Sequence, residues 1–335
     1  MINKIADIFG LICIAIVYDY IGFQGTVLLV LVVFLFSLAG GKLSSFWVPV
    51  VISLLASSKF PESDFYFYMK QFKSIGYLGY SEFILVNIKS PLFYGIMLIQ
   101  SLFLDSWRAA SFLLIVLSNY LMYSVLMKIS RNDLELLLFS LLLFGFYPIF
   151  DQSNHLMRQY MASAIMFALV YGKGREMLLT VSGFLTHLSF AVFFVKIISK
   201  RTLLYVLAML PILLIPSVDK FLDLLIFSRN INIVEFKELN LMQILLVSPL
   251  LILPILNRNA AVFLLIVLCT MFIFRQNSEI VLRYWKFLVF FVPIVFIEFT
   301  RINRQLGNAL ILALIPIELA YFIFNILESP WTYTI

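Results

Sequence analysis

Apolar stretches recur along almost the whole chain, separated by short polar segments. They fall near residues 5–23, 24–40, 46–58, 91–104, 109–127, 134–150, 159–172, 177–195, 203–218, 240–256, 260–274, 280–300 and 307–326. Segments such as 26–39 are apolar on nearly all sides and lack the period-two alternation of a barrel strand. Because lipid leaves only helices or a closed barrel as ways to satisfy the backbone, this pattern predicts an all-α polytopic integral membrane protein.

Some of these stretches are too short to cross a membrane alone. Residues 46–58, 91–104 and 159–172 fall below the roughly 17 residues that a hydrocarbon core of about 30 Å requires. We therefore expect half-spans or re-entrant segments among them, and roughly 10–12 transmembrane helices in a single transmembrane domain covering residues 1–335.

Two polar stretches are too long to be simple turns, residues 59–90 and 219–240. In the first, Phe65, Tyr68 and Phe72 recur at helical spacing among charged residues, which predicts an amphipathic helix in an extracytoplasmic loop. The second has balanced charges and is interpreted as a solvated connector or a lid.

The composition excludes a soluble domain. Hydrophobic residues make up 63% of the 335 positions and charged residues only 13%, which is too few to coat a water-exposed surface. Cys13 and Cys269 lie in apolar stretches without CxxC spacing, so we expect neither a metal nor another cofactor. The first apolar stretch contains Asp7 and no small-residue cleavage site follows it, which favours a retained span over a signal peptide.

The net charge of +6 resides in short loops, which indicates anionic lipid headgroups or an anionic lipid-linked substrate as partners, and not nucleic acid. Ordinary enrichment of basic residues in cytoplasmic loops explains it as well. Simple alternation of the predicted spans cannot bring all the basic clusters to one side of the membrane. These clusters are Lys128 with Arg131, Lys173 with Arg175, Lys196 with Lys200 and Arg201, and Arg301 with Arg304.

The densest group of polar residues is DQSNHLMRQYMASA, residues 151–164. If a helix begins near Asp151, then Asp151, His155 and Arg158 share one face, and Gln159 lies beside them. Such a face can hold an anion and a proton acceptor together. The alternative is structural, with Asp151 or Ser153 as an N-cap and Arg158 extending to the interface.

Three further positions are candidates because ionisable residues are costly within a span. His187 lies inside an apolar stretch, where it is either a buried histidine bonded to a neighbouring helix or a proton acceptor. Arg283 follows Glu279 by four residues and is either its ion-pair partner or a phosphate ligand. Asp64 and Tyr68 share a face of the predicted loop helix.

The order of these motifs resembles the EpsG/Wzy-type bacterial polysaccharide polymerases, over roughly residues 45–300. The motifs are D-x-x-x-Y (Asp64, Tyr68), R-Q-x-x-A (Arg158, Gln159, Ala162), H-x-S (His187, Ser189) and R-Y (Arg283, Tyr284). The G-x-R that usually precedes the first-loop aspartate is replaced by Lys59-Phe60-Pro61.

The resemblance implies a membrane glycosyltransferase at the outer face of the bacterial inner membrane. It would transfer a growing glycan from polyprenyl pyrophosphate to a sugar hydroxyl of a new lipid-linked repeat unit, with a flippase and a chain-length regulator as further partners. A pyrophosphate leaving group requires fixed cations, for which Arg158 and Arg283 are our first choices and Arg175 or Arg301 the substitutes. Gln159 and Tyr284 would complete the binding site for pyrophosphate and sugar.

The same chemistry requires a proton acceptor, and His187, His155 and Asp64 compete for that role. His187 ranks first because burial makes its charge state adjustable. Tyrosines, namely Tyr66, Tyr68 and Tyr77, would stack on sugar faces. A flippase or transporter of lipid-linked oligosaccharide and an O-antigen ligase remain as alternatives, although no internal repeat supports a transporter.

Overall fold

The computed structural model describes residues 2–39, 45–58, 63–78, 82–83, 87, 90–172, 175–196, 248–274 and 278–328. Within these ranges the chain is helical and contains no strand, which confirms the all-α prediction. The predicted polar connector at 219–240 lies outside the described residues, as do the side chains of Asp64 and His155.

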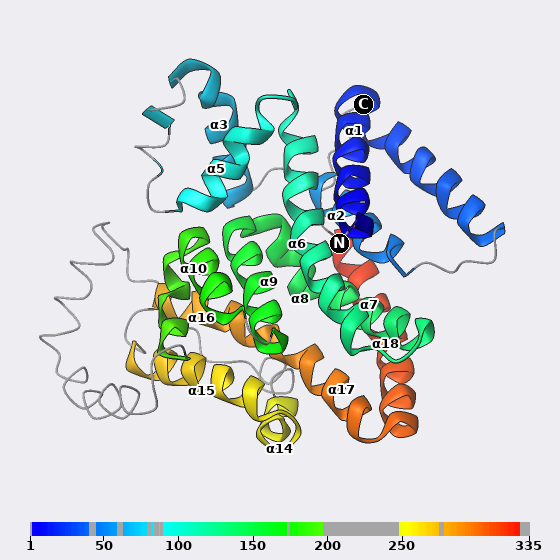
Figure 1. The fold of residues 1–335 in the computed structure, drawn as a ribbon, viewed down its shortest axis with the longest axis vertical. Helices are drawn as coiled ribbons and strands as arrows, with labels where there is room; N and C mark the ends of the chain where they lie inside the picture. Colours follow the sequence, from blue (N-terminus) through cyan, green and yellow to red (C-terminus); the bar gives the residue numbers. More distant parts are fainter. Residues whose placement is uncertain are drawn as a thin grey trace, which may run out of the picture.

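The helices form one bundle in which neighbouring helices cross at a range of angles (Figure 1). They are α1 (Ile2–Ala39), α2 (Trp47–Ser58), α3 (Ser63–Leu78), α5 (Pro91–Gln100), α6 (Trp107–Ile129), α7 (Asp133–Gly145), α8 (Tyr147–His155), α9 (Met157–Tyr171), α10 (Glu176–Thr186), the 3₁₀ helices η1 (Leu188–Lys196) and η2 (Ser248–Ile252), α14 (Leu253–Leu256), α15 (Arg258–Ile273), α16 (Ser278–Val289), α17 (Phe291–Ile302) and α18 (Arg304–Glu328).

Four helical segments among the described residues are long and apolar enough to cross a membrane. They are Asp7–Val32, Trp107–Ile129, Ile280–Ile302 and Arg304–Ile323, and the bent pair Asp133–Gly145 and Tyr147–Ser153 adds a fifth if it counts as one span. Shorter apolar helices such as α2, α5, α10 and α15 account for several of the remaining hydrophobic stretches. Several apolar helices therefore support a membrane protein, and the predicted count of 10–12 spans stays a prediction.

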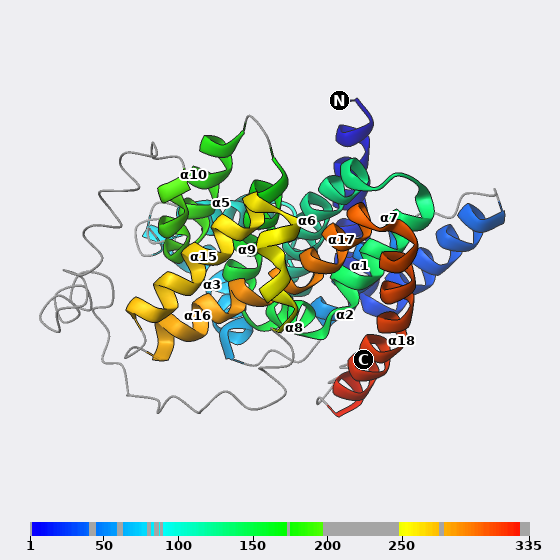
Figure 2. The same ribbon diagram turned by 90° about the horizontal axis from the view of Figure 1, so that it is seen from below.

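Helix α6 forms the centre of the molecule, between α1 and α2 on one side and α9 on the other (Figures 1 and 2). Its polar side chains bond to these neighbours: the Asn119 amide donates to Ser53 Oγ at 2.8 Å, and the Tyr160 hydroxyl donates to the Asn119 carbonyl oxygen. All three side chains are buried, so their polar groups find partners within the bundle instead of in lipid.

The first helix is broken at a glycine. Gly22 has φ +68° and ψ −172°, a conformation that is costly for residues with a Cβ, and the two halves of α1 diverge there. The predicted stretches 5–23 and 24–40 are thus the two arms of one kinked helix.

Residues 151–164 do not form the single helix that the sequence predicted. Helix α8 starts earlier, at Tyr147 beside Pro148, and ends at His155, while α9 starts at Met157. Leu156 between them has φ −128° and ψ 52°, which interrupts the helical path. Asp151 and His155 both belong to α8, but the predicted extension of their face to Arg158 is wrong, because the break at Leu156 ends the helical register of α8 before Arg158.

Asp151 is also not an N-cap, since it lies inside α8, with its carboxylate 3.6 Å from Lys286 Nζ of α16. The ion pair links two elements that are far apart in the sequence.

The stretch 177–195 is likewise divided. Helix α10 ends at Thr186, His187 is extended (φ −154°, ψ 125°), and a 3₁₀ helix follows. Phe190 folds back against α10 at Gly183, where a Cβ would overlap the phenyl ring. The close approach of Phe190 thus requires glycine there and fixes the direction of the chain after His187.

Candidate functional site

Arg158 lies in the first turn of α9 and reaches across to two other elements. Its Nε donates to the hydroxyl of Tyr68 on α3 at 3.0 Å, and its Nη1 donates to Oγ of Ser90, just before α5, at 3.3 Å. Tyr68 and Ser90 are both buried. The guanidinium is therefore oriented by hydrogen bonds and does not simply extend to the membrane interface.

Two aromatic rings flank the same guanidinium. The Arg158 Cζ lies 5.5 Å from the ring centroid of Tyr68 and 5.8 Å from that of Tyr94, distances at which cation–π attraction operates. Sequence reasoning named Tyr68 but missed Ser90 and Tyr94. The Ser90-Pro91 pair is typical of the start of a helix, so the sequence could have predicted the start of α5. No local signal connects Ser90 with Arg158, which lies 68 positions later in the chain.

Two glutamines join this region to α16. The Gln159 amide donates to the carbonyl oxygen of Arg283, and the Gln152 amide donates to the carbonyl oxygen of Lys286 at 3.0 Å. Both glutamines are buried, with exposed fractions of 3% and 0%. They fix α16 against the α8–α9 break, and so they set the position of Arg283 relative to Arg158.

His187 occupies the break between α10 and η1, outside the helices that are long enough to span a membrane. Its backbone N–H donates to the Gly183 carbonyl at 2.9 Å, and its ring Nδ1 accepts from the backbone N–H of Ser189 at 3.2 Å. The Tyr284 hydroxyl of α16 donates to the Ser189 carbonyl at 2.7 Å. Tyr284 thereby ties the turn that carries His187 to the helix that carries Arg283.

The electrostatic environment of His187 connects these contacts into one site. Burial, and after it the positive charges of Arg158 and of Arg283, lower the pKa of His187 to about 3. The imidazole is consequently neutral at physiological pH. The positive charges of the arginines on α9 and α16 add to the effect of burial in favouring the uncharged imidazole.

The structure brings together six of the eight residues predicted for the site. They are Arg158, Gln159, His187, Arg283, Tyr284 and Tyr68, contributed by α3, α9, α16 and the break after α10. Asp64 belongs to the first turn of α3 and His155 is the last residue of α8, and their side chains lie outside the described part of the chain.

Two of the predicted tyrosines, Tyr68 and Tyr284, are enclosed by protein, whereas Tyr66 and Tyr77 are exposed. The Tyr68 ring is only 1% exposed and lies against Arg158 and Phe93, so it is enclosed by protein. Tyr66 and Tyr77 on the same helix are 45% and 92% exposed. Tyr284 is 5% exposed, and its hydroxyl bonds to protein backbone.

No family model, curated protein or solved structure matches this chain. Its function is therefore argued from the arrangement of these side chains. Within the described residues no group of three His, Cys, Asp or Glu side chains is placed to hold a metal ion.

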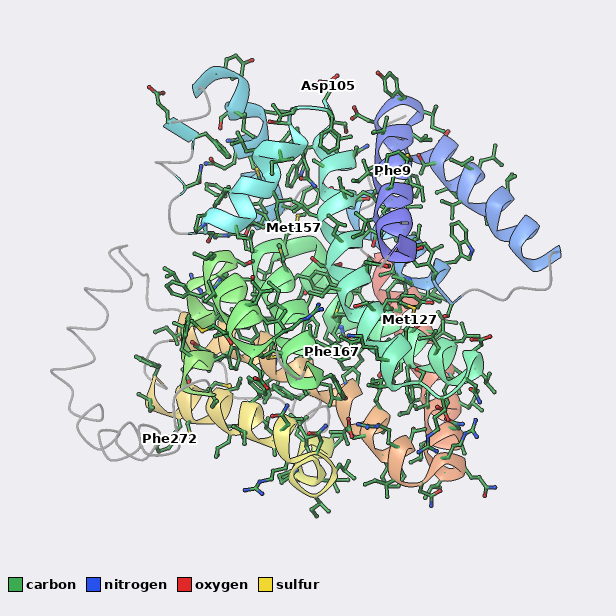
Figure 3. The ribbon with its side chains drawn as sticks, in the orientation of Figure 1. Phe9, Asp105, Met127, Met157, Phe167 and Phe272 are labelled. Carbon is green, nitrogen blue, oxygen red and sulfur yellow. The ribbon has the colours of Figure 1, made fainter. Side chains whose placement is uncertain are left out.

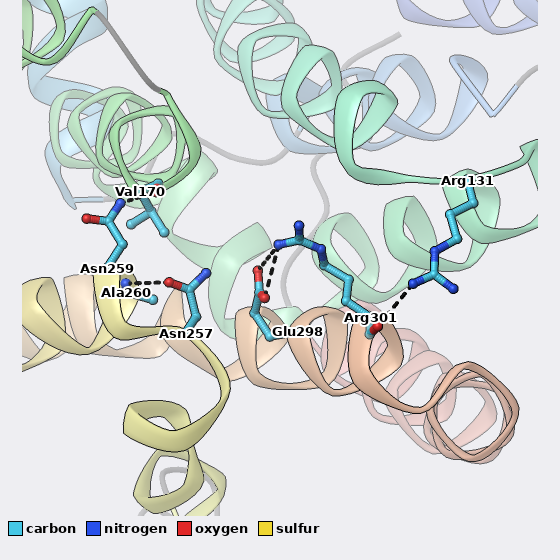
Figure 4. A network of polar contacts seen from close by, with 7 residues as sticks. All are labelled: Arg131, Val170, Asn257, Asn259, Ala260, Glu298 and Arg301. Carbon is cyan, nitrogen blue, oxygen red and sulfur yellow. Dashed lines mark hydrogen bonds and ion pairs between the residues drawn. The ribbon is translucent and has the colours of Figure 1, made fainter.

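A second polar network lies at the opposite end of α9 (Figure 4). Arg301 Nη1 contacts both carboxylate oxygens of Glu298, at 3.0 and 3.1 Å, and the backbone carbonyl of Arg301 accepts from Arg131. Arg304 pairs with the buried Glu135 at 2.6 Å. Arg301, the substitute cation for the site, therefore belongs to this network, which we call the basic end.

Two of the four basic clusters seen in the sequence converge at the basic end. Lys128 and Arg131 lie at the turn from α6 to α7, and Arg301 and Arg304 lie at the turn from α17 to α18. Arg175 follows the end of α9. The Val170 carbonyl near the end of α9 accepts from Asn259 of α15, and Arg258 is adjacent. The side chain of Lys196 and residues 197–247 lie outside the described part of the chain.

The two polar regions are separated by the length of α9. The 15 residues of this helix correspond to about 22 Å at 1.5 Å per residue. In Figure 3, Met157 lies beside the elements that hold Arg158, and Phe167 lies farther toward the basic end, as Met127 does on α6. The candidate site and the basic end therefore lie at opposite ends of α9.

Proposed function

We propose that this protein is a membrane glycosyltransferase of the bacterial inner membrane that polymerises lipid-linked oligosaccharide repeat units. The observation that carries the proposal is that Arg158 is held by Tyr68 and Ser90 while its neighbour Gln159 donates to the backbone carbonyl of Arg283, so that α9 and α16 bring two arginines into one region. Guanidinium groups bind phosphate oxygens in pairs and keep their charge when desolvated, so they suit a pyrophosphate carried by a polyprenyl lipid.

The reaction is a substitution at the anomeric carbon of the growing glycan. The oxygen of a sugar hydroxyl on the new repeat unit forms a bond to that carbon while the bond to the pyrophosphate oxygen breaks. The pyrophosphate leaves with the electron pair, and Arg158 and Arg283 stabilise its developing charge. The hydroxyl proton passes to a proton acceptor, for which Asp64, His155 and His187 are the candidates.

The position of the basic end supports a site at the outer face. Cytoplasmic loops carry an excess of Lys and Arg, and Lys128, Arg131, Arg301 and Arg304 meet at one end of the bundle. With that end in the cytoplasm, a site about 22 Å away along α9 falls near the opposite leaflet, where exported lipid-linked units are available.

The decisive experiment is deletion of the gene followed by gel analysis of surface glycan and of lipid-linked intermediates. We expect loss of the long glycan ladder and accumulation of lipid carrying a single repeat unit. Complete absence of repeat units from the outer face would indicate a flippase, and free polymer that is not attached to its final acceptor would indicate a ligase. Either result would contradict the proposal.

Variants expressed in the deletion strain test whether Arg158 is needed for polymerisation. Arg158→Ala should abolish the ladder, because the leaving group loses a fixed cation, and Arg158→Lys should restore it only in part, because an ammonium cannot bind in bidentate fashion. Arg258→Ala is the matched control, since Arg258 is an exposed arginine at the basic end. A full ladder from Arg158→Ala at normal expression would remove Arg158 from the site.

A further inference from the structure

We propose that His187 acts as a neutral hydrogen-bond donor, presenting Nε2–H to a phosphate oxygen of the lipid pyrophosphate, and not as the proton acceptor for the sugar hydroxyl. The inference rests on the proposed function for the identity of the anion. The tautomer itself follows from contacts within the protein.

The first step of the argument is the hydrogen bond at Nδ1. The backbone N–H of Ser189 donates to Nδ1 at 3.2 Å, and a backbone amide can only donate. Nδ1 must therefore carry a lone pair, and a neutral imidazole then carries its proton on Nε2. Nε2 is then a donor, and the Nδ1 lone pair that a base would need already accepts from the protein.

The second step concerns what holds that hydrogen bond in place. The Ser189 carbonyl accepts from the Tyr284 hydroxyl at 2.7 Å, and the Phe190 amide donates to the His187 carbonyl at 2.9 Å. Both contacts fix the turn that directs the Ser189 amide at the imidazole. Tyr284 is thus a positioning residue: it holds the Ser189 backbone, whose N–H selects the tautomer of His187.

The third step is charge. His187 is 8% exposed and lies within the electrostatic influence of Arg158 and Arg283, which oppose a third positive charge. A histidine with a pKa near 3 is too weak a base to remove a hydroxyl proton effectively at neutral pH. In the proposed site a neutral N–H donor instead adds a hydrogen bond to the anion whose charge Arg158 and Arg283 stabilise.

The reaction then needs a different proton acceptor. Asp64, in the first turn of α3, and His155, at the end of α8, remain as candidates, since α3 and α8 pack together beside Arg158 and Tyr68. The bonds that form and break in the proposed reaction stay the same. The sugar hydroxyl still loses its proton, but the proton passes to a residue other than His187.

Nitrogen-15 NMR of the histidine rings in the full-length protein tests the tautomer. The chain has only two histidines, so a His155→Asn variant leaves the signals of His187 alone. We expect the Nε2-protonated neutral form at every pH between about 5 and 8, and a shift of the Nε2 proton resonance on addition of inorganic pyrophosphate. The inference would be overturned by an Nδ1-protonated ring or by an imidazolium signal in that pH range. It would also be overturned if the Nε2 proton resonance did not shift on addition of pyrophosphate.

Two substitutions separate a donor from a base in the glycan assay. Glutamine places its amide nitrogen near the position of Nε2, whereas asparagine reaches only the position of Nδ1. His187→Gln should therefore retain a shortened ladder and His187→Asn should lose it, at equal expression. Loss of activity in both, with Nε2–H absent from the spectrum, would restore His187 as a base.

Tyr284→Phe supplies a readout that does not depend on the reaction. Without the hydroxyl that anchors Ser189, the His187 ring should show a mixture of tautomers, and an unchanged spectrum would contradict the positioning role. If the spectra behave as expected and the deletion strain still makes full-length glycan, the donor tautomer stands and only the proposed function fails.

Discussion

At the scale of single residues, Arg158 is the best-defined group of the site. A guanidinium inside a membrane protein is costly unless its donors are paired, and here Tyr68 and Ser90 accept from it while Tyr94 adds a ring face. The two acceptors come from separate elements, so the direction of the guanidinium depends on how α3 and α5 pack on α9.

Removal of one hydroxyl tests this positioning. Tyr68→Phe keeps the ring beside Arg158 but deletes the acceptor of its Nε–H. Hydrogen bonds to charged groups contribute about 1.5–3 kcal/mol, so polymerisation should slow by roughly tenfold or more. The rate of glycan synthesis in membranes measures the effect.

Tyr66→Phe on the same helix is the control, because Tyr66 is 45% exposed and its ring contacts Lys70 instead. Equal rates for the two variants would mean that the Tyr68 hydroxyl does not orient Arg158.

At the scale of elements, two breaks in apparently continuous segments shape the site. The break at Leu156 starts α9 beside Ser90, and the break at His187 exposes a ring nitrogen to the Ser189 amide. A helix that continued through either point would satisfy the same backbone groups, so the breaks depend on packing against neighbouring elements.

The break at His187 depends on Gly183. In Gly183→Ala the new Cβ would overlap the Phe190 ring, and Phe190 is fully buried against Phe193 and Phe287. Overpacking of this kind typically costs about 1–3 kcal/mol. We expect a lower thermal unfolding temperature in detergent and loss of the Ser189 contact to His187, seen as a changed histidine NMR spectrum.

Gly10→Ala is the matched control, because nothing lies within 4 Å of a Cβ at Gly10 of α1. An unfolding temperature for Gly183→Ala that equals that of Gly10→Ala would show that Phe190 can move without cost.

At the scale of the whole molecule, the basic end and the candidate site lie at opposite ends of α9, and the proposed function assigns them to opposite faces of the membrane. Arg131, Arg301 and Arg304 are linked through backbone and carboxylate contacts, and two of their acids, Glu135 and Glu298, are buried. Buried acids of this kind persist only when paired, so the network also fastens α7 to α17 and α18.

Cysteine labelling in cells tests the direction. In a background with Cys13→Ala and Cys269→Ala, Tyr77→Cys on α3 should react with a membrane-impermeant maleimide from outside. Lys128→Cys at the basic end should react only after the membrane is permeabilised, because basic loops stay in the cytoplasm. The reverse pattern would place the candidate site at the inner face and contradict the proposed function.

The sequence by itself determined the class of the protein and most of the residues of the site. Its hydropathy required helices, because lipid offers no partner for unpaired backbone groups. Arg158, His187 and Arg283 were identifiable as candidates because each is an ionisable residue in or beside an apolar stretch, which is costly without a role.

Only the tertiary structure decided how those side chains are held and which residues they contact. Hydropathy averages over a stretch, so it cannot show that Leu156 or His187 interrupts a helix, since both breaks are stabilised by contacts with distant elements. Ser90 and Tyr94 were missed for the same reason: their partner Arg158 is more than 60 residues away in the chain. The convergence of the basic clusters and the tautomer of His187 likewise depend on long-range packing, which one-dimensional spacing does not encode.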